Sequence, residues 1–410
     1  MALASGTQSE TVTGRWPDGA GMIYLGMSPW EGMWRNRHQL MSRFAASMPV
    51  LYVQPAQKLK RLRREGRPLQ RILGSIGRPA VERLDTNLGV FRSREYHVVS
   101  GSGVLGTVTE DRWYRAVTNA ARNMGIRYPI LWTSIPAHAK AIGRLDEVLS
   151  VYHVVDEYAG YTLVDEARRK RLKADESKLL NAADVVIAVS DELVEAKRGP
   201  DRDVHLVENA VDFEAFRQAT ESASIPEDMM SIPGPRLGYS GLISKRLDLG
   251  LLERMAMSYP DWSIVLIGKV DNRRCEAAMD ALHARPNVHF LGEKHFRDVP
   301  AYVAGFDVGL LPYEVNEETL HISPLKMYEY LATGLPVVST EIPSAQKKCG
   351  HVAIATDDNG FLRSCEQALS DIESGREARI SEAATNTWDQ RVQQIKDILV
   401  PRLGERLARQ

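Results

Sequence analysis

The sequence predicts an α/β protein built of two successive doubly wound units, each with a parallel β-sheet. Its 410 residues are too many for one ordinary domain and suit two of roughly 200 residues each. Short continuous apolar runs, typical of strands buried on both faces of a parallel sheet, alternate with helical patterns along the chain. A polar segment with several prolines, 216–235, separates two groups of these runs and is typical of a linker.

Most of these runs are continuous and apolar, and each lies between helical patterns, so we expect each to form a strand. The first group lies at 21–27, 49–55, 89–96, 129–134, 149–156, 184–190 and 204–209. The second group lies at 236–241, 263–268, 288–293, 308–313, 335–340 and 351–356. We therefore expect a flexible N-terminus (1–20), an N-terminal domain (21–215), a C-terminal domain (236–385) and a final helix (386–410) that packs back on the N-terminal domain. Ligands of such folds bind at the carboxyl ends of the strands, which here face a cleft between the domains.

The composition limits the possible environments and partners. With 44% hydrophobic and 26% charged residues the chain is typical of a soluble globular protein, and its net charge of −1 does not favour a nucleic-acid partner. Cys275, Cys349 and Cys365 lack the Cys-x-x-Cys spacing of metal or redox sites, which favours a reducing compartment. The first residues lack the apolar core of a signal peptide, and no apolar run reaches the ~18 residues of a membrane span. We expect a cytoplasmic protein.

The stretch SPLKMYEYLATGLPVVST, 323–340, contains several residues that are typical of the beginning and end of a helix. Ser323 is placed as an N-cap, Pro324 as the first helical residue and Gly334 just past the helix end, which predicts a helix over about 324–333. The free N–H groups and the dipole of such a helix make its N-terminus an anion site.

Lys326 adds a full charge to the first turn of this helix, and Glu329 lies one turn further along. The two residues could form an ordinary surface ion pair at spacing i, i+3. Alternatively, the helix end and Lys326 hold the phosphates of a nucleotide diphosphate while Glu329 accepts hydrogen bonds from ribose hydroxyls.

The pattern P-L-K-x-Y-E-Y-L-A-x-G-x-P-V-V in this stretch resembles the nucleotide-sugar-binding signature of GT-B glycosyltransferases. Residues 209–212 (NAVD) look like the N-G-V-D that closes the N-terminal domain in this family, and 238–252 (GYSGLISKRLDLGLL) is similar to its first C-terminal strand and loop. The resemblance is continuous over roughly 180–340 and weaker from 20 to 180. The chain is similar to family members of the bacterial exopolysaccharide and cell-surface polysaccharide type, such as the xanthan glucuronosyltransferase group and related family 4-like transferases.

The resemblance implies two Rossmann-like domains that face a cleft. The C-terminal domain would bind a nucleotide diphosphate sugar such as a UDP-sugar, and the N-terminal domain would bind a saccharide or polyprenyl-diphosphate-linked saccharide acceptor. It places donor contacts at Lys245, Arg246, Glu293, Tyr313, Ser323, Leu325, Lys326 and Glu329. Glu293 and Tyr313 could instead be simple rim residues of the cleft.

Many retaining members of this family carry Glu-x7-Glu, but His321 stands eight residues before Glu329. We therefore expect an inverting transferase, with a retaining one as the alternative. An inverting enzyme needs a base on the acceptor hydroxyl. Asp156, at the end of the predicted strand 149–156, resembles the strand-end acid proposed as base in the xanthan group, although it could instead cap the following helix. His38 is the second-choice base and, with Arg35, is expected to border the acceptor site.

The cationic groups of the donor site would replace a metal ion, so we expect neither a metal nor a cofactor besides the nucleotide sugar. Asp201-Arg202-Asp203 fits an Asp-x-Asp metal motif but lies in a turn. Gly101-x-Gly103-x-x-Gly106 is compatible with an NAD(P)-dependent oxidoreductase, yet the next predicted strand lacks the required terminal acid. A non-catalytic nucleotide-sugar-binding protein remains a further alternative.

Residues 58–79 form a basic stretch with interleaved leucines and isoleucines. Its first cationic residues are Lys58, Lys60, Arg61, Arg63 and Arg64. Basic amphipathic segments bind anionic membrane surfaces, although an ordinary solvated helix or loop has the same composition. We expect peripheral association with the inner face of the cell membrane.

Overall fold

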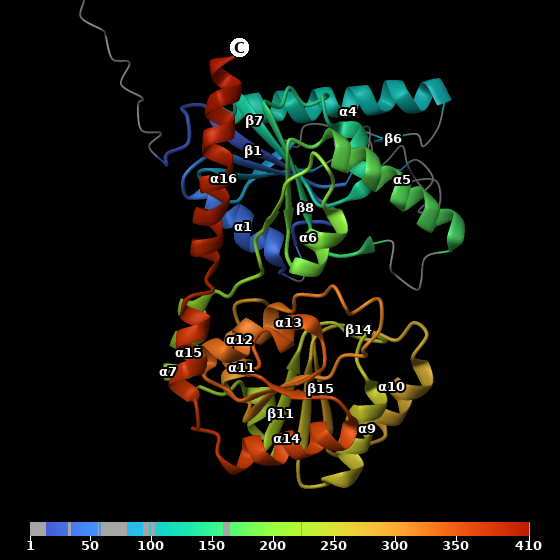
Figure 1. Ribbon diagram of the computed structural model, residues 1–410, viewed down its shortest axis with the longest axis vertical. Helices are drawn as coiled ribbons and strands as arrows, with labels where there is room; N and C mark the ends of the chain where they lie inside the picture. The colour runs from blue at the N-terminus through green and yellow to red at the C-terminus, as the bar shows by residue number, and fades with distance from the viewer. Residues whose placement is uncertain are drawn as a thin grey trace, which may run out of the picture.

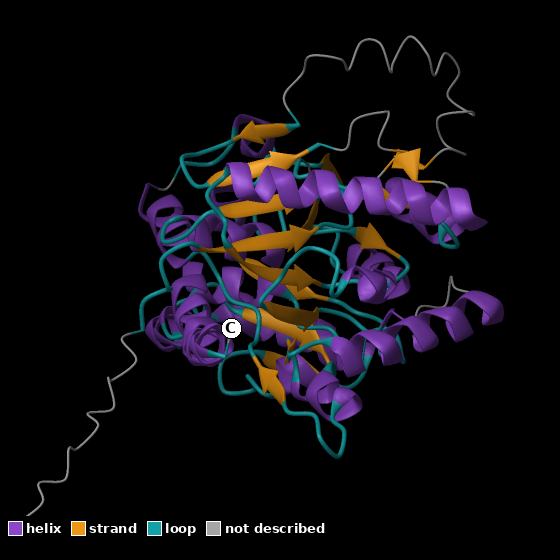
Figure 2. Cartoon of the chain, turned by 90° about the horizontal axis from the view of Figure 1, so that it is seen from above, coloured by secondary structure: helices purple, strands orange, loops and turns teal. Residues whose placement is uncertain are grey.

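The computed structural model describes residues 14–31, 34–55, 57–58, 80–92, 98–99, 103–158, 165–222 and 224–409. Two α/β domains lie one above the other along the longest axis, and the last helix, α16 (Trp388–Ala408), lies along the side of the upper domain (Figure 1). Seen from above, helices lie on both sides of the strands (Figure 2). The predicted fold class is confirmed.

The N-terminal sheet has the strand order β10-β9-β8-β7-β1-β2-β5-β4. Its pairs are parallel, except that the edge strand β4 runs antiparallel to β5. The seven predicted strands are present, and β4 is an addition. The strands are β1 (Ala20–Leu25), β2 (Val50–Val53), β4 (Val81–Arg83), β5 (Leu88–Phe91), β7 (Tyr128–Thr133), β8 (Leu149–Val154), β9 (Val185–Ala188) and β10 (Val204–Leu206).

The C-terminal sheet is fully parallel, with the order β15-β13-β11-β16-β17-β18, and it contains the six strands predicted for this part of the chain. These are β11 (Arg236–Ser240), β13 (Ser263–Ile267), β15 (Val288–Gly292), β16 (Val308–Leu311), β17 (Val337–Thr340) and β18 (Ala353–Ala355). Two short pairs complete the strands, β3 (Gln57–Lys58) with β6 (Val98–Val99) and β12 (Ile243–Ser244) with β14 (Val270–Asp271).

Alternating side chains of the central strands point into separate apolar layers, as the two-residue period of a strand requires. On β1, Met22 and Tyr24 belong to the cluster that contains side chains of α1 (Asn36–Ala45) and α16 (Trp388–Ala408). Ile23 and Leu25 belong to the cluster on the other face, which contains side chains of α4 (Gly103–Asn123). Burial of both faces explains why these strands are continuous apolar runs in the sequence.

The remaining helices connect and cover the strands. They are the 3-10 helix η1 (Pro136–Ala141) and the α-helices α5 (Glu166–Ala182), α6 (Asp191–Lys197), α7 (Phe213–Ser222), α8 (Glu227–Met230), α9 (Leu249–Ser258), α10 (Glu276–His283), α11 (Val299–Ala304), α12 (Leu325–Thr333), α13 (Pro343–Gln346), α14 (Asp358–Ser370) and α15 (Arg376–Ala384).

The segment 216–235 differs from the predicted linker, because most of α7 and the whole of α8 lie in it. Phe216, Met229 and Ile232 are buried in the core of the C-terminal domain. Three apolar residues so unevenly spaced produce no helical period in the sequence, although each covers part of the sheet. The segment is therefore part of the C-terminal domain.

The last helix, α16, packs on the N-terminal domain, as predicted. Trp388, Ile395, Leu399 and Leu403 are buried in the same cluster as the side chains of α1. These positions recur at intervals of seven, four and four residues, so they form one apolar stripe along the helix. The chain thus crosses between the domains twice, once before α7 and once before α16.

Candidate active site

A cavity of about 600 Å³ lies between the two domains and is lined by residues of both. Its walls come from the carboxyl ends of the parallel strands and from the start of α12. Val155 and Asp156 follow β8, while Ser240 and Gly241 come from the end of β11 and the loop after it. The volume is within the usual range of small-molecule sites, and the position is where doubly wound sheets bind their ligands.

Helix α12 points its N-terminus into this cavity, but the helix begins one residue later than predicted. Pro324 is the N-cap residue and has an extended backbone (φ −73°, ψ 118°), so Ser323 is not the cap. The backbone carbonyl of Ser323 instead accepts a hydrogen bond of 2.7 Å from the Asn209 side chain of the N-terminal domain. No side-chain cap hydrogen bond is made by Pro324, so the first N–H groups of α12 are available to a ligand.

Lys326 lines the cavity from the first turn of α12. Its ammonium group donates a 2.7 Å hydrogen bond to the hydroxyl of Tyr313 and lies 4.6 Å from the centre of the Tyr239 ring. Burial alone would lower the pKa of Lys326, but the two phenol oxygens outweigh that effect and raise it above its ordinary value. Lys326 is therefore a permanent cation beside the helix tip.

Glu329 lies one turn along α12 and also lines the cavity. Among the described residues, it makes no ion pair with Lys326 within 4.0 Å, so the two do not form the simple surface pair. Burial raises the pKa of the Glu329 carboxyl from 4.5 to about 7, and nearby Lys326 offsets part of the rise. The group can accept hydrogen bonds from hydroxyls with both oxygens once it is ionised.

The basic pair Lys245 and Arg246 is anchored by Glu318, an acid that the sequence reading did not identify. Lys245 Nζ lies 2.5 Å from one Glu318 oxygen, and Arg246 Nε lies 3.0 Å from the other. Arg246 lines the cavity, whereas Lys245 is not among its lining residues. Glu318 therefore holds Arg246 at the edge of the cavity, and it lies in the loop before α12, outside every recognised motif.

Asp156 lies two residues beyond β8 and lines the cavity from the N-terminal domain. One oxygen accepts a hydrogen bond from the Glu157 N–H, and the other lies 3.3 Å from an Arg246 nitrogen across the cavity. Helix α5 begins at Glu166 and has Asp165 as its N-cap residue, so Asp156 does not cap it.

His38 does not reach the cavity. It is fully buried in α1, where Nδ1 accepts a 3.0 Å hydrogen bond from the Arg35 N–H and Nε2 lies 3.0 Å from the Trp30 carbonyl. An accepting Nδ1 requires that Nε2 carries the proton and donates it. Burial lowers the pKa of His38 to about 3. The second-choice assignment of His38 as base is therefore wrong, and the residue fixes the start of α1.

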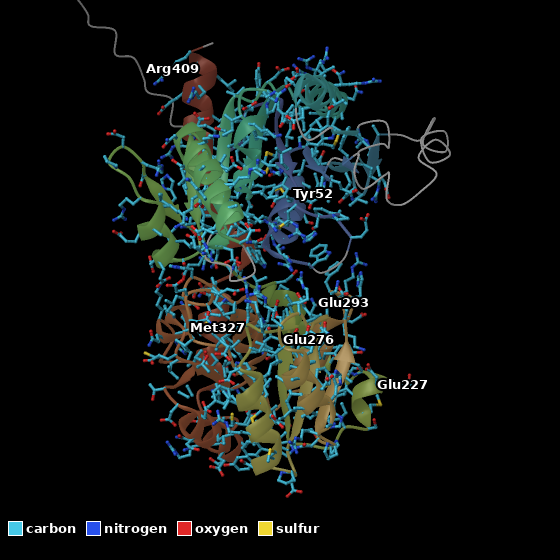
Figure 3. All side chains as sticks on the ribbon, turned by 90° about the vertical axis from the view of Figure 1, so that its right-hand side faces the viewer. Tyr52, Glu227, Glu276, Glu293, Met327 and Arg409 are labelled. Atoms are coloured by element: carbon cyan, nitrogen blue, oxygen red, sulfur yellow. The ribbon has the colours of Figure 1, made fainter. Side chains whose placement is uncertain are left out.

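The other predicted donor contacts are all at the cavity. Glu293 is exposed and directly follows β15, at the end of the C-terminal domain that faces the other domain (Figure 3). Tyr313 is buried and positions Lys326, while Leu325 reaches from α12 toward the apolar cluster of the N-terminal domain. Trp34 and Phe296 were not predicted as site residues. Their rings stack at the cavity, with centroids 3.6 Å apart.

Comparisons with known proteins show the family to which the chain belongs. The model of the family "Glycosyl transferases group 1" matches residues 236–371. A Bacillus subtilis (strain 168) protein named as a teichuronic acid biosynthesis glycosyltransferase, TuaH, is 30% identical over 380 residues, which cover 88% of this chain and 91% of the relative. The chain belongs to the group 1 glycosyltransferases. It is therefore an enzyme that transfers a sugar.

Solved structures similar to this group 1 glycosyltransferase confirm the GT-B fold. Anabaena HepE, in a complex with UDP and glucose, has a TM-score of 0.65 at 13% identity, and the match covers 92% of this chain and 98% of that one. Sucrose-phosphate synthase from Thermosynechococcus elongatus has a TM-score of 0.67 at 16% identity, with 93% and 98% covered. An E. coli trehalose-6-phosphate protein bound with UDP-2-fluoro glucose has a TM-score of 0.64 at 10% identity, with 93% and 99% covered.

Several other sequence predictions fall at places that the structure describes only in part. Lys60, Arg61, Arg63, Arg64 and Gly101 lie outside the described residues, and Lys58 belongs to β3 without a described side chain. Asp201 and Asp203 are exposed in the turn before β10.

Within the ranges given for the fold, no cluster of three or more His, Cys, Asp or Glu side chains is placed to hold a metal ion. None of the described helices combines the length and apolar character that crossing a bilayer requires.

Glu329 makes the stability of this glycosyltransferase depend on pH in a defined direction. Because its pKa is higher in the folded chain than in the unfolded one, its contribution is complete below about pH 4.5 and is lost as the pH rises through about 7. As the pH rises from 4.5 to 8, we expect the free energy of unfolding of Glu329→Gln to increase relative to that of the wild type, by at most about 3 kcal/mol in total. Urea denaturation at several pH values measures this difference, and a difference that is constant with pH would contradict the buried carboxyl.

Proposed function

We propose that this glycosyltransferase moves a sugar from a nucleotide diphosphate sugar, such as a UDP-sugar, to a saccharide or lipid-linked saccharide acceptor, with inversion and without a metal ion. The product would belong to a cell-surface polysaccharide. One observation carries the proposal: a single cavity holds the helix tip, Lys326 and Glu329 on one side and the Asp156 carboxylate on the other.

The donor diphosphate binds at the start of α12. Its negative charge is met by the first N–H groups of the helix and by the Lys326 ammonium group. Glu329, one turn deeper, accepts hydrogen bonds from the ribose hydroxyls. Complexes of the similar structures with UDP and glucose, and with UDP-2-fluoro glucose, support this class of donor.

Transfer needs a base for the acceptor hydroxyl and stabilisation of the departing diphosphate. Asp156 takes the hydroxyl proton while the acceptor oxygen attacks the anomeric carbon from the face opposite the diphosphate. The bond from that carbon to the diphosphate oxygen breaks, and the electron pair leaves with the nucleotide. The charge that develops on the diphosphate is stabilised by Lys326 and the helix tip, which is the role a metal ion has in other transferases.

Arg246 links the two halves of this reaction. Its guanidinium lines the cavity and contacts Asp156 at 3.3 Å, which is long for a charge-assisted hydrogen bond. A bound diphosphate would compete with Asp156 for this cation. Donor binding would thereby loosen the carboxylate that has to accept the acceptor proton.

The acceptor class is supported by the Bacillus relative, which is named for teichuronic acid biosynthesis. An inverting course is supported by a departure from the Glu-x7-Glu pattern of many retaining members of the family. In this chain His321, eight residues before Glu329, stands where that pattern has its first acid. His321 is not among the residues that line the cavity, and its backbone carbonyl faces Ser190 of the N-terminal domain.

The direct test is turnover with a panel of UDP-sugars and saccharide acceptors. We expect release of UDP at the same rate in EDTA and in Mg²⁺, because protein cations carry the charge stabilisation. NMR of the product should show the anomeric configuration opposite to that of the donor. Retention of configuration would support the retaining alternative, and tight nucleotide-sugar binding without any turnover would support a non-catalytic binding protein.

Asp156→Asn isolates the step assigned to the base. The substitution keeps the shape of the side chain but removes its ability to take a proton, so we expect kcat to fall by about 10²–10⁴. The Kd of UDP, measured by calorimetry, should stay within about twofold, since α12 is unchanged. Equal losses in turnover and in UDP affinity would contradict the assignment.

The basic segment that begins at Lys58 gives the acceptor domain an affinity for anionic membranes in this proposal. Replacing Lys60, Arg61, Arg63 and Arg64 by Gln should abolish co-sedimentation with vesicles that contain 30% phosphatidylglycerol and leave turnover with soluble acceptors unchanged. The matched control replaces four basic residues of α5, namely Arg168, Arg171, Lys173 and Lys178. If the wild-type chain does not sediment with these vesicles, the membrane proposal fails.

A further inference from the structure

Arg37 is a buried cation on the acceptor side of the cavity. It lies in the first turn of α1, is only 6% exposed, and is among the residues that line the cavity. Nothing in the reaction described above uses it. A buried guanidinium is costly unless an anion or a full set of hydrogen bonds accompanies it.

Within the described part of the chain, the contacts of Arg37 include no carboxylate that would compensate its charge. One nitrogen donates a 2.7 Å hydrogen bond to the Ser28 hydroxyl, while Nε is buried and has no hydrogen-bond partner among the described residues. The guanidinium lies close enough to Tyr52 to counteract the rise that burial causes in the pKa of that phenol. No carboxylate of the described chain comes within 4.0 Å of it.

Arg43, two turns along the same helix, has the opposite environment. It lies 3.2 Å from carboxylate oxygens of both Asp212 and Asp389 and does not line the cavity. Among the residues that the structure describes, Arg43 therefore has two counter-ions, and the more deeply buried Arg37 has none. The difference suggests that the anion for Arg37 comes from a ligand.

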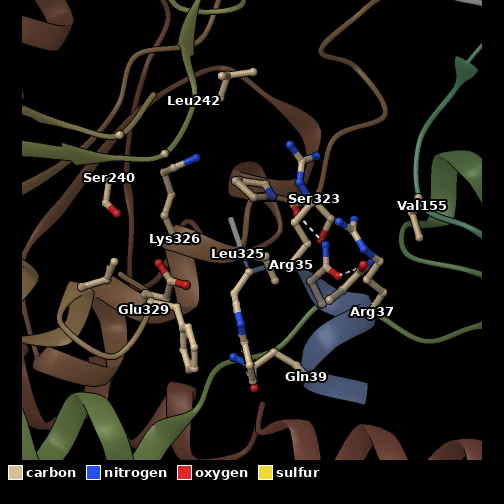
Figure 4. A pocket seen from close by; sticks show the side chains of 18 of the residues that line it. Arg35, Arg37, Gln39, Val155, Ser240, Leu242, Ser323, Leu325, Lys326 and Glu329 are labelled. Atoms are coloured by element: carbon tan, nitrogen blue, oxygen red, sulfur yellow. Dashed lines mark hydrogen bonds between the residues drawn. The ribbon is translucent and has the colours of Figure 1, made fainter. Parts of the chain in front are cut away.

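The surroundings of Arg37 favour an anion as well. The N-terminus of α1 adds a partial positive charge, and the Arg35 side chain also lines this part of the cavity. Figure 4 shows Arg35 and Arg37 on the side of Leu325 away from Lys326 and Glu329. The cavity thus has two separate cationic ends, one on α12 for the donor and one on α1.

We propose that the α1 end of the cavity binds an acceptor that carries an anionic group, with Arg37 as its counter-ion. The group is either the carboxylate of a uronic acid residue or a phosphate that links the saccharide to a carrier, since both match the planar fork of a guanidinium. The inference rests on the proposed function, because it assigns the acceptor to the N-terminal side of the same cavity.

The experiment uses the full chain saturated with UDP and three soluble probes: methyl β-D-glucuronide, α-D-glucose 1-phosphate and the neutral methyl β-D-glucoside. We expect at least one anionic probe to bind 10-fold or more tightly than the glucoside, by NMR titration. The tighter of the two anionic probes identifies which anion the site takes. This comparison needs no variant, so a folding defect cannot obscure it.

Arg37→Gln should then lower the affinity for the anionic probe to that of the glucoside, and Arg37→Lys should recover part of it. The matched control Arg43→Gln should keep the preference of the wild type, and all three variants should keep its Kd for UDP. Equal binding of charged and neutral probes by the wild type would overturn the inference. An equal loss of UDP and probe affinity in Arg37→Gln would overturn it as well, because Arg37 would then belong to the donor site. If UDP itself does not bind the wild type, the proposed function fails first.

Discussion

The placement of one helix N-terminus between two sheets is the constraint on which the site depends. α12 begins where the carboxyl ends of both sheets face each other, and its start is fixed from the opposite domain by the Asn209 hydrogen bond to the Ser323 carbonyl. Leu325 packs toward the N-terminal cluster at the same point. The first N–H groups of the helix are thereby held at the boundary between the domains, where neither core can cover them.

The electrostatics of the cavity follow from this arrangement. At the α12 end of the cavity, the cations that stay charged without a ligand have partners: Lys326 contacts the phenol of Tyr313, and Arg246 contacts the carboxylate of Glu318. Among the described residues, Glu329 has no such partner, and burial raises the pKa of its carboxyl. The donor end therefore carries a permanent cation beside a carboxyl that titrates near neutral pH.

Much of the fold could be predicted, because strands buried on both faces leave continuous apolar runs. β4 could not be predicted, because two of its three residues are exposed and the strand lies at an antiparallel edge of the sheet. The two-residue strands are too short to show an alternating pattern. In the site, the common location of Lys326, Glu329 and Asp156 could be predicted, because ligands of such folds bind at the carboxyl ends of the strands. The Glu318 contact could not, since 72 residues separate it from Arg246, and the burial of His38 depends on the carbonyl of Trp30 in a loop.

The two crossings between the domains have a mechanical consequence. Val211 in the first crossing and Thr387 in the second form a parallel bridge, with backbone hydrogen bonds of 3.0 Å from Val211 to Asn386 and 3.2 Å from Trp388 to Val211. The two connections between the domains are thus held together by backbone hydrogen bonds. The Trp34–Phe296 stack and the Asp156–Arg246 pair also join the two domains, so any separation of the domains at the cavity would break both contacts.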